Sequence, residues 1–115
     1  MGFSLEELRD TEALAELNFV NRGIEKESLR VSHKGEISKL KHPDKLGSAL
    51  TNPYITTDFS ESLLELITPT FHSAKECLDF LRELHVFVYN NIGHELLWPF
   101  SMPCPIASDE EIPIG

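Results

Sequence analysis

The pattern that most constrains the fold of this chain lies over residues 73–92. Ser73 is followed three residues later by Glu76, which is the spacing of a capping box at the start of a helix. Gly93 then supplies a stop signal. Between these two ends, apolar side chains recur at helical spacing, namely Cys77, Leu81, Leu84, Val88 and Ile92. We therefore expect one long amphipathic helix over residues 73–92.

Other stretches give weaker structural signals. Residues 4–18 read as a second helix, because Ser4 and Glu7 have capping-box spacing and an acidic face accompanies a stripe of leucines at 5, 8, 14 and 17. Residues 24–31 and 36–38 flank a turn-like stretch in which Gly35 is free to adopt a positive φ. We expect a β-hairpin there, then a loop-rich region and, after the long helix, an extended tail rich in proline.

Composition narrows the class of protein. The chain has 115 residues, 41% of them hydrophobic and 25% charged, which fits one compact globular domain. Its formal charge is −9, from 19 acidic and 10 basic residues. No cluster of Lys and Arg interleaved with aromatics is present, so we expect no nucleic-acid partner and no anionic membrane partner.

Targeting signals and cysteine chemistry are also constrained. Nothing approaches 18 consecutive apolar residues, and the first residues are acidic where a signal peptide is basic, so we expect a cytoplasmic protein. Cys77 and Cys104 lack the spacing of a zinc site or a disulfide framework, and we expect both to be buried thiols.

An unusual charge alternation occurs over residues 21–31. If this stretch is extended, Glu25 and Glu27 project from one face, while Arg22, Lys26 and Arg30 project from the other. Two carboxylates about 7 Å apart on one face of a strand can chelate a hard cation such as Mg²⁺ or Mn²⁺. A solvated hairpin whose charges cancel is the simpler interpretation, and the pattern alone favours it.

The stretch from residue 55 to residue 69 is ambiguous between helix and strand. Phe59, Leu63, Leu66 and Ile67 form a helical stripe, and this periodicity favours a helix. In the alternative, residues 61–68 form a strand in which two acids share a face with large apolar neighbours. Such buried acids need a metal or a basic partner to offset their desolvation. The pattern does not decide between the two.

The C-terminal residues, Glu111 to Gly115, are apolar and extended in character, unlike the polar ends of most domains. They predict that the chain is part of a larger protein.

Several motifs, in the order in which they occur, together resemble one enzyme family. The chain is similar to the proteobacterial type of glutamate-cysteine ligase, also called gamma-glutamylcysteine synthetase. The matching segments are residues 22–31, 42–43 with 46–51, 55–61 with 64–65 and 67–69, and 97–99 with 101–104.

The resemblance implies both a fold and an activity. The family joins the γ-carboxylate of glutamate to the amine of cysteine, using ATP and Mg²⁺, in the first step of glutathione synthesis. Its fold is similar to that of glutamine synthetase, an α+β architecture in which a curved antiparallel sheet with flanking helices cups the site. The resemblance covers residues 1–115 as the N-terminal portion of the catalytic domain, and it makes residues 61–68 a strand against the local periodicity.

The resemblance also assigns site residues. Glu25, Glu27, Asp58 and Glu65 match the magnesium-binding acids of the family, with Mn²⁺ as a possible substitute. Phe59 matches a wall of the cysteine pocket. Glu61 is a weaker candidate ligand, because no motif matches it and only the strand face that it would share with Glu65 keeps it near the site.

Two functional hypotheses of different classes follow. In the first, the chain is part of an ATP-dependent ligase whose substrates are glutamate, cysteine and ATP, and is inactive by itself. In the second, it is an acidic module that binds a divalent metal or a protein without catalysis. In either case we expect an exposed sheet edge to promote self-association.

Overall fold

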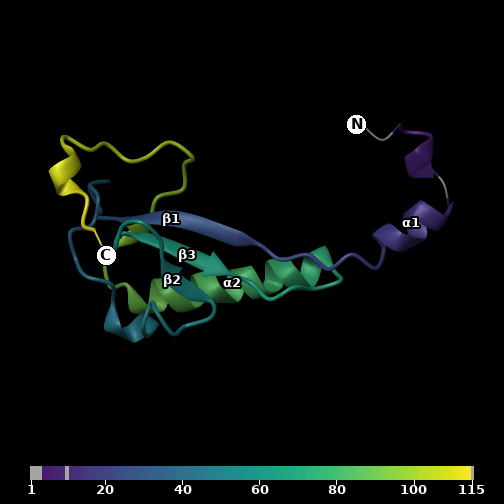
Figure 1. The fold of residues 1–115 in the computed structure, drawn as a ribbon. Coiled ribbons are helices and arrows are strands. Elements are labelled where there is room, and N and C mark those ends of the chain that lie inside the picture. The colour runs from purple at the N-terminus through teal and green to yellow at the C-terminus, as the bar shows by residue number, and fades with distance from the viewer. Residues whose placement is uncertain (1–3, 10, 115) are drawn as a thin grey trace.

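The computed structural model describes residues 4–9 and 11–114, and within its helices and strands the side chains of residues 8, 11 and 13 are not described. The fold is α+β, as the sequence predicts (Figure 1). Its strands are β1 (Glu25–Val31), β2 (Ile55–Thr57), β3 (Leu63–Ile67) and β4 (Leu96–Leu97). Its helices are η1 (Glu7–Arg9), α1 (Thr11–Leu17), η2 (Asp44–Leu46), α2 (Ala74–Asn91) and η3 (Asp109–Glu111).

The four strands form one antiparallel sheet in the order β2-β3-β1-β4. In the central pair, Glu27 lies opposite Glu65, and Thr56 of β2 lies on the other side of Glu65. Strands β1 and β3 therefore set which side chains share each face of the sheet, because side chains alternate along a strand.

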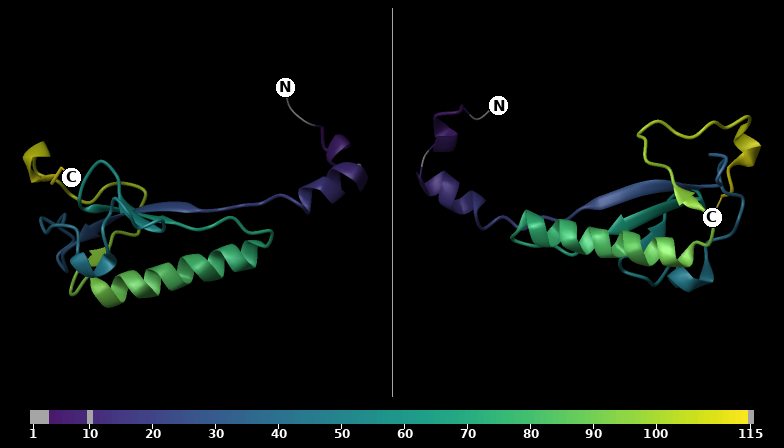
Figure 2. Two further views of the ribbon diagram at one scale, coloured as in Figure 1. Left: turned by 60° about the horizontal axis from the view of Figure 1, so that its bottom comes forward. Right: turned by 180° about the vertical axis from the view of Figure 1, so that it is seen from behind.

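Helix α2 covers one face of the sheet (Figure 2). The core between them contains Leu64 and Leu66 of β3, Ile55 of β2, and Leu84 and Val88 of α2. Burying these apolar side chains stabilises the two layers by roughly 1.5 to 3 kcal/mol for each large residue.

Strand β1 turns its basic residues toward this helix-covered side, as the charge alternation predicts. Lys26 Nζ lies 2.7 Å from His85 Nε2 of α2. The alternation places the acidic side chains of β1 on the opposite, open face.

The long helix and the turn after β1 are confirmed, but residues 36–38 form no strand and pair with β1 only through an isolated bridge between Val31 and Ile37. Ser73 accepts a hydrogen bond from the Glu76 backbone N–H, and Gly93 follows the helix with φ of +65°. The turn after β1 closes through a hydrogen bond of 2.8 Å from the Ser32 N–H to the Glu36 carbonyl, with Gly35 at φ of +78°. No helix among the residues with described coordinates is long and apolar enough to cross a lipid bilayer.

The prediction of one helix over residues 4–18 is wrong in extent. Only Thr11–Leu17 is α-helical, and Glu7–Arg9 forms a 3₁₀ turn; Asp10 and the side chain of Leu8 lie outside the described residues. The capping box itself is present, with the Ser4 N–H donating to Glu7 Oε2 at 2.8 Å. Figures 1 and 2 show this arm extending away from the sheet, and Leu14 and Leu17 are about half exposed. Leucines that stay about half exposed stabilise a helix only weakly.

The helical periodicity over residues 59–67 is also overruled. This stretch contains β3, which pairs with β1 on one side and β2 on the other. Leu64 and Leu66 are buried against α2, while Leu63, Glu65 and Ile67 point to the open face and are half-buried. Pairing on both edges satisfies the backbone of β3, so tertiary context decides its conformation.

Replacing Leu66 by Ala tests this core. Leu66 is fully buried, so the substitution should lower the free energy of unfolding by about 2–5 kcal/mol. Leu50 is 95% exposed, and Leu50→Ala should change it by less than about 0.5 kcal/mol. Urea denaturation of both variants measures the difference, and equal effects would contradict the described layers.

Candidate functional site

The open face of the sheet gathers carboxylates from two strands. Glu27 and Glu65 are direct partners across β1 and β3, and Glu25 lies two residues along β1 opposite Ile67. Directly opposed side chains in an antiparallel pair have Cβ atoms about 5 Å apart. Like charges in this position destabilise a sheet, so this arrangement is not explained by stability.

The electrostatics of Glu65 show that the acids act on one another. The pKa of Glu65 is raised above its ordinary value of 4.5, first by desolvation and then by the negative charges of Glu25, Glu27 and Asp58. One carboxyl thus senses all three other acids that the sequence predicts as metal ligands. Perturbed carboxyls of this kind are typical of functional sites.

Asp58 reaches the group from the turn that joins β2 to β3. Its backbone N–H donates to the Leu63 carbonyl at 3.1 Å, which closes the turn, and its side chain is exposed. Glu61 lies in the same turn and is half-buried, but it is not one of the three carboxylates that raise the pKa of Glu65.

Phe59 lies next to Asp58 and is 70% exposed. It lines an open hollow of about 320 Å³ together with Asp109, Ile112 and Ile114. The same turn therefore carries Asp58 and an exposed aromatic side chain, but the hollow that Phe59 lines includes none of the four acids.

A second groove, of about 270 Å³, lies beside Glu27 on the open face. Leu29 and Leu63 belong to its floor, and Trp98 and Phe100 lie across it with their ring centroids 5.2 Å apart. This arrangement puts apolar surface directly beside the acidic group, which is the composition of a typical small-molecule site.

The donor chemistry fits a hard cation. All four acids offer carboxylate oxygens, which Mg²⁺ and Mn²⁺ prefer. As the side chains are placed, no three potential ligands among the described residues converge closely enough to hold an ion. Glu27 and Glu65 face each other across the strands, so metal binding would require the side chains to be brought closer together.

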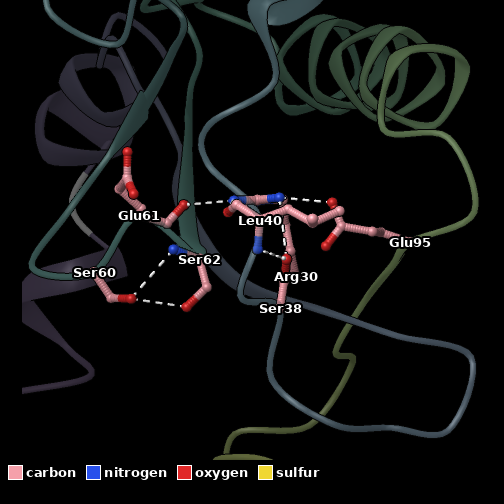
Figure 3. Close-up of polar contacts among 7 residues, drawn as sticks. All are labelled: Arg30, Ser38, Leu40, Ser60, Glu61, Ser62 and Glu95. Atoms are coloured by element: carbon pink, nitrogen blue, oxygen red, sulfur yellow. Dashed lines mark hydrogen bonds and ion pairs between the residues drawn. The ribbon is translucent and has the colours of Figure 1, made fainter. Parts of the chain in front are cut away.

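The sequence left open the role of Arg30, and the structure gives it a central place (Figure 3). Its side chain is fully buried and forms an ion pair of 2.6 Å with Glu95. The sequence signal for Arg30 is the charge alternation, which places it on the strand face opposite to Glu25 and Glu27. A charge on a core-facing position needs partners, but the alternation does not say which.

Comparisons with known proteins agree with these features. The family model described as glutamate-cysteine ligase matches residues 5–115. The glutamate-cysteine ligase of Alcanivorax borkumensis is 50% identical over 108 residues, which is 94% of this chain and 21% of the relative. That of Wigglesworthia glossinidia brevipalpis is 56% identical over 94 residues, or 82% of this chain and 19% of the relative.

Two solved structures resemble the fold. A crystal structure of glutamate-cysteine ligase from Francisella tularensis in complex with AMP matches with a TM-score of 0.76 and 44% identity, over 80% of this chain and 18% of that one. A bifunctional glutathione synthetase from Pasteurella multocida matches with a TM-score of 0.82 and 34% identity, over 96% of this chain and 16% of that one. The chain therefore spans about a fifth of the length of the relatives that it matches.

The electrostatics predict that Glu65→Gln stabilises the metal-free chain at pH 7. Because folding raises the pKa of Glu65, the folded state binds this proton more tightly than the unfolded state. The difference in stability between Glu65→Gln and the wild type should therefore be small below pH 4.5. It should grow as the pH rises through the raised pKa of Glu65 and stay constant above it.

Thermal melts across this pH range provide the test. Glu83→Gln is a suitable control because Glu83 lies exposed on α2, and its effect should stay within about 0.5 kcal/mol. A Glu65→Gln chain that is less stable than the wild type at pH 7 would contradict the repulsion described here.

Proposed function

From the premise that this chain belongs to the glutamate-cysteine ligase family, we propose that it supplies the acidic, metal-binding strands of an ATP-dependent ligase. The reaction joins the γ-carboxylate of glutamate to the amine of cysteine, which is the first step of glutathione synthesis. The observation that supports this most strongly is the electrostatic coupling of Glu65 to Glu25, Glu27 and Asp58 across one sheet face.

The chemistry explains why such a site contains acids. A carboxylate is a poor acyl donor, so its oxygen first attacks the γ-phosphorus of ATP, which releases ADP and forms an acyl phosphate. The amine nitrogen of cysteine then attacks the acyl carbon, the amine loses a proton, and phosphate leaves. Both steps concentrate negative charge, which Mg²⁺ neutralises when it is bound.

Each predicted residue has a role in this proposal. Glu25, Glu27, Asp58 and Glu65 would hold Mg²⁺, or Mn²⁺ in its place, and the ion would supply positive charge to the reaction. Phe59 forms a wall of the pocket that receives cysteine, and its exposed ring beside Asp58 supports that role. The AMP bound in the Francisella tularensis relative supports the use of ATP as cosubstrate. We propose that the protein works in the cytoplasm, where ATP and both amino acids are available.

Activity should need more polypeptide than these 115 residues. The chain spans about a fifth of its relatives, so we expect no measurable glutamate- and cysteine-dependent ATP hydrolysis from it alone. A chimera in which it replaces the matched part of the Alcanivorax borkumensis relative should turn over in the ordinary range of about 1 to 1,000 per second. A folded but inactive chimera would contradict the proposed function.

Within that chimera, Glu65→Gln separates a metal role from a surface role. Activity should fall by more than about tenfold at limiting Mg²⁺ and partly recover at high Mg²⁺. Glu61→Gln is the matched comparison from the adjacent turn and should have the milder effect. A Glu65→Gln chimera with the parental rate at limiting Mg²⁺ would refute the metal assignment.

Self-association through β2 is a further expectation. Strand β2 lies at one edge of the sheet, and strand alternation directs the Thr57 N–H away from β3 because the neighbouring Asp58 N–H donates to β3. Sedimentation of the chain should show concentration-dependent dimers, and Thr57→Pro should weaken them by removing that donor. A monomer at all concentrations would rule this out.

A further inference from the structure

We propose that Arg30 is a positioning residue for the acidic site. Its buried guanidinium fixes the turn that carries Asp58 relative to β1, and thereby sets Asp58 against the acids of β1 and β3. This inference rests on the proposed function and adds a residue that does not itself touch metal or substrate.

The guanidinium donates hydrogen bonds to four residues in three separate segments of the chain (Figure 3). Nη1 donates to Glu95 Oε1 at 2.6 Å and to Ser38 Oγ at 3.3 Å. Nη2 donates to the carbonyl oxygens of Leu40 at 2.8 Å and Glu61 at 2.9 Å. The planar fork of Arg can serve these acceptors at once, and the single ammonium of Lys cannot reproduce that geometry.

Stability alone does not explain this arrangement. A buried ion pair often stabilises a protein no more than well-packed apolar residues would, because both ions must be desolvated. Arg30 Nε is also buried without a hydrogen-bond partner in the described part of the chain. A buried donor left without an acceptor lowers the stability of the fold. The guanidinium therefore contributes geometry that an apolar side chain could not.

The Arg30 guanidinium fixes the position of the turn between β2 and β3. Arg30 holds this turn twice, because its side chain donates to the Glu61 carbonyl and its backbone N–H donates to the Ser62 carbonyl at 2.7 Å. On the other side, the Pro113 carbonyl accepts hydrogen bonds from Glu61 N–H and from Ser60 Oγ. The turn is clamped between these two supports.

Backbone hydrogen bonds connect this turn to Asp58. The Asp58 N–H donates to the Leu63 carbonyl, and the Leu63 N–H donates to the Ser60 carbonyl at 2.9 Å. Asp58 and Glu61 belong to the same short turn, so we infer that a shift of the turn at Glu61 displaces the Asp58 side chain relative to Glu65. Arg30 itself belongs to β1, the strand that carries Glu25 and Glu27. It therefore connects that strand with the turn that carries Asp58.

The test is a double-mutant cycle on Mn²⁺ affinity. All four proposed ligands lie in this chain, so Mn²⁺ binding can be measured on the 115-residue protein by electron paramagnetic resonance, without nucleotide. Arg30→Lys should weaken Mn²⁺ binding by about tenfold, the lower end of the effect of supporting residues around a metal site. In a chain that already carries Asp58→Asn, the same substitution should have less than about a twofold further effect, because the ligand that it positions is gone.

Controls separate the possible failures. Exposed Arg82 on α2 provides a matched control, and Arg82→Lys should leave Mn²⁺ affinity unchanged. If Arg30→Lys does not fold, as judged by a melting curve, Glu95→Gln replaces it in the cycle, because it keeps an acceptor for Arg30 but removes the charge. Glu95→Gln should show a smaller loss that also disappears with Asp58→Asn.

The experiment distinguishes a failure of the positioning role of Arg30 from a failure of the proposed metal assignment. Equal weakening by Arg30→Lys with and without Asp58→Asn would overturn the positioning role and leave the metal assignment standing. If the wild-type chain does not bind Mn²⁺, or if Asp58→Asn leaves its affinity unchanged, the proposed metal assignment fails and the role of Arg30 falls with it.

Discussion

The site depends on the register between β1 and β3. A shift of one residue would turn the acids of one strand toward α2 and bring the apolar residues of that strand to the open face. The observed register places Glu27 directly opposite Glu65. Two features oppose any such shift: the burial of Leu64 and Leu66 against α2, and the contact of Lys26 with His85.

This register stabilises the fold on one face of the sheet and destabilises it on the other. The helix-covered face stabilises the fold through apolar packing, while the open face opposes two carboxylates and raises the pKa of Glu65. Proteins accept such local costs where a site needs them. A bound divalent cation would reverse the balance by neutralising the repulsion, which is the reason for the metal site that we propose on this face.

Local sequence patterns predicted some of this structure and missed the rest for identifiable reasons. The helix at 73–92 and the turn around Gly35 depend on nearby residues, and both are present, although the second arm of the predicted hairpin is reduced to one bridge. The strand at Leu63–Ile67 has a helical period and is decided by pairing with two distant strands. The partners of Arg30 are also beyond local prediction, because two of them are backbone carbonyls and Glu95 lies 65 residues away.

The central claim is that Glu25, Glu27, Asp58 and Glu65 form one divalent-cation site. Paramagnetic broadening of backbone amide signals by substoichiometric Mn²⁺ would locate the ion directly. The account predicts that broadening centres on the amides of β1, β3 and Asp58. Broadening centred instead on Asp109–Glu111, a run of three acids in η3, would show that the chain binds cations only through an exposed acidic segment and would contradict the account.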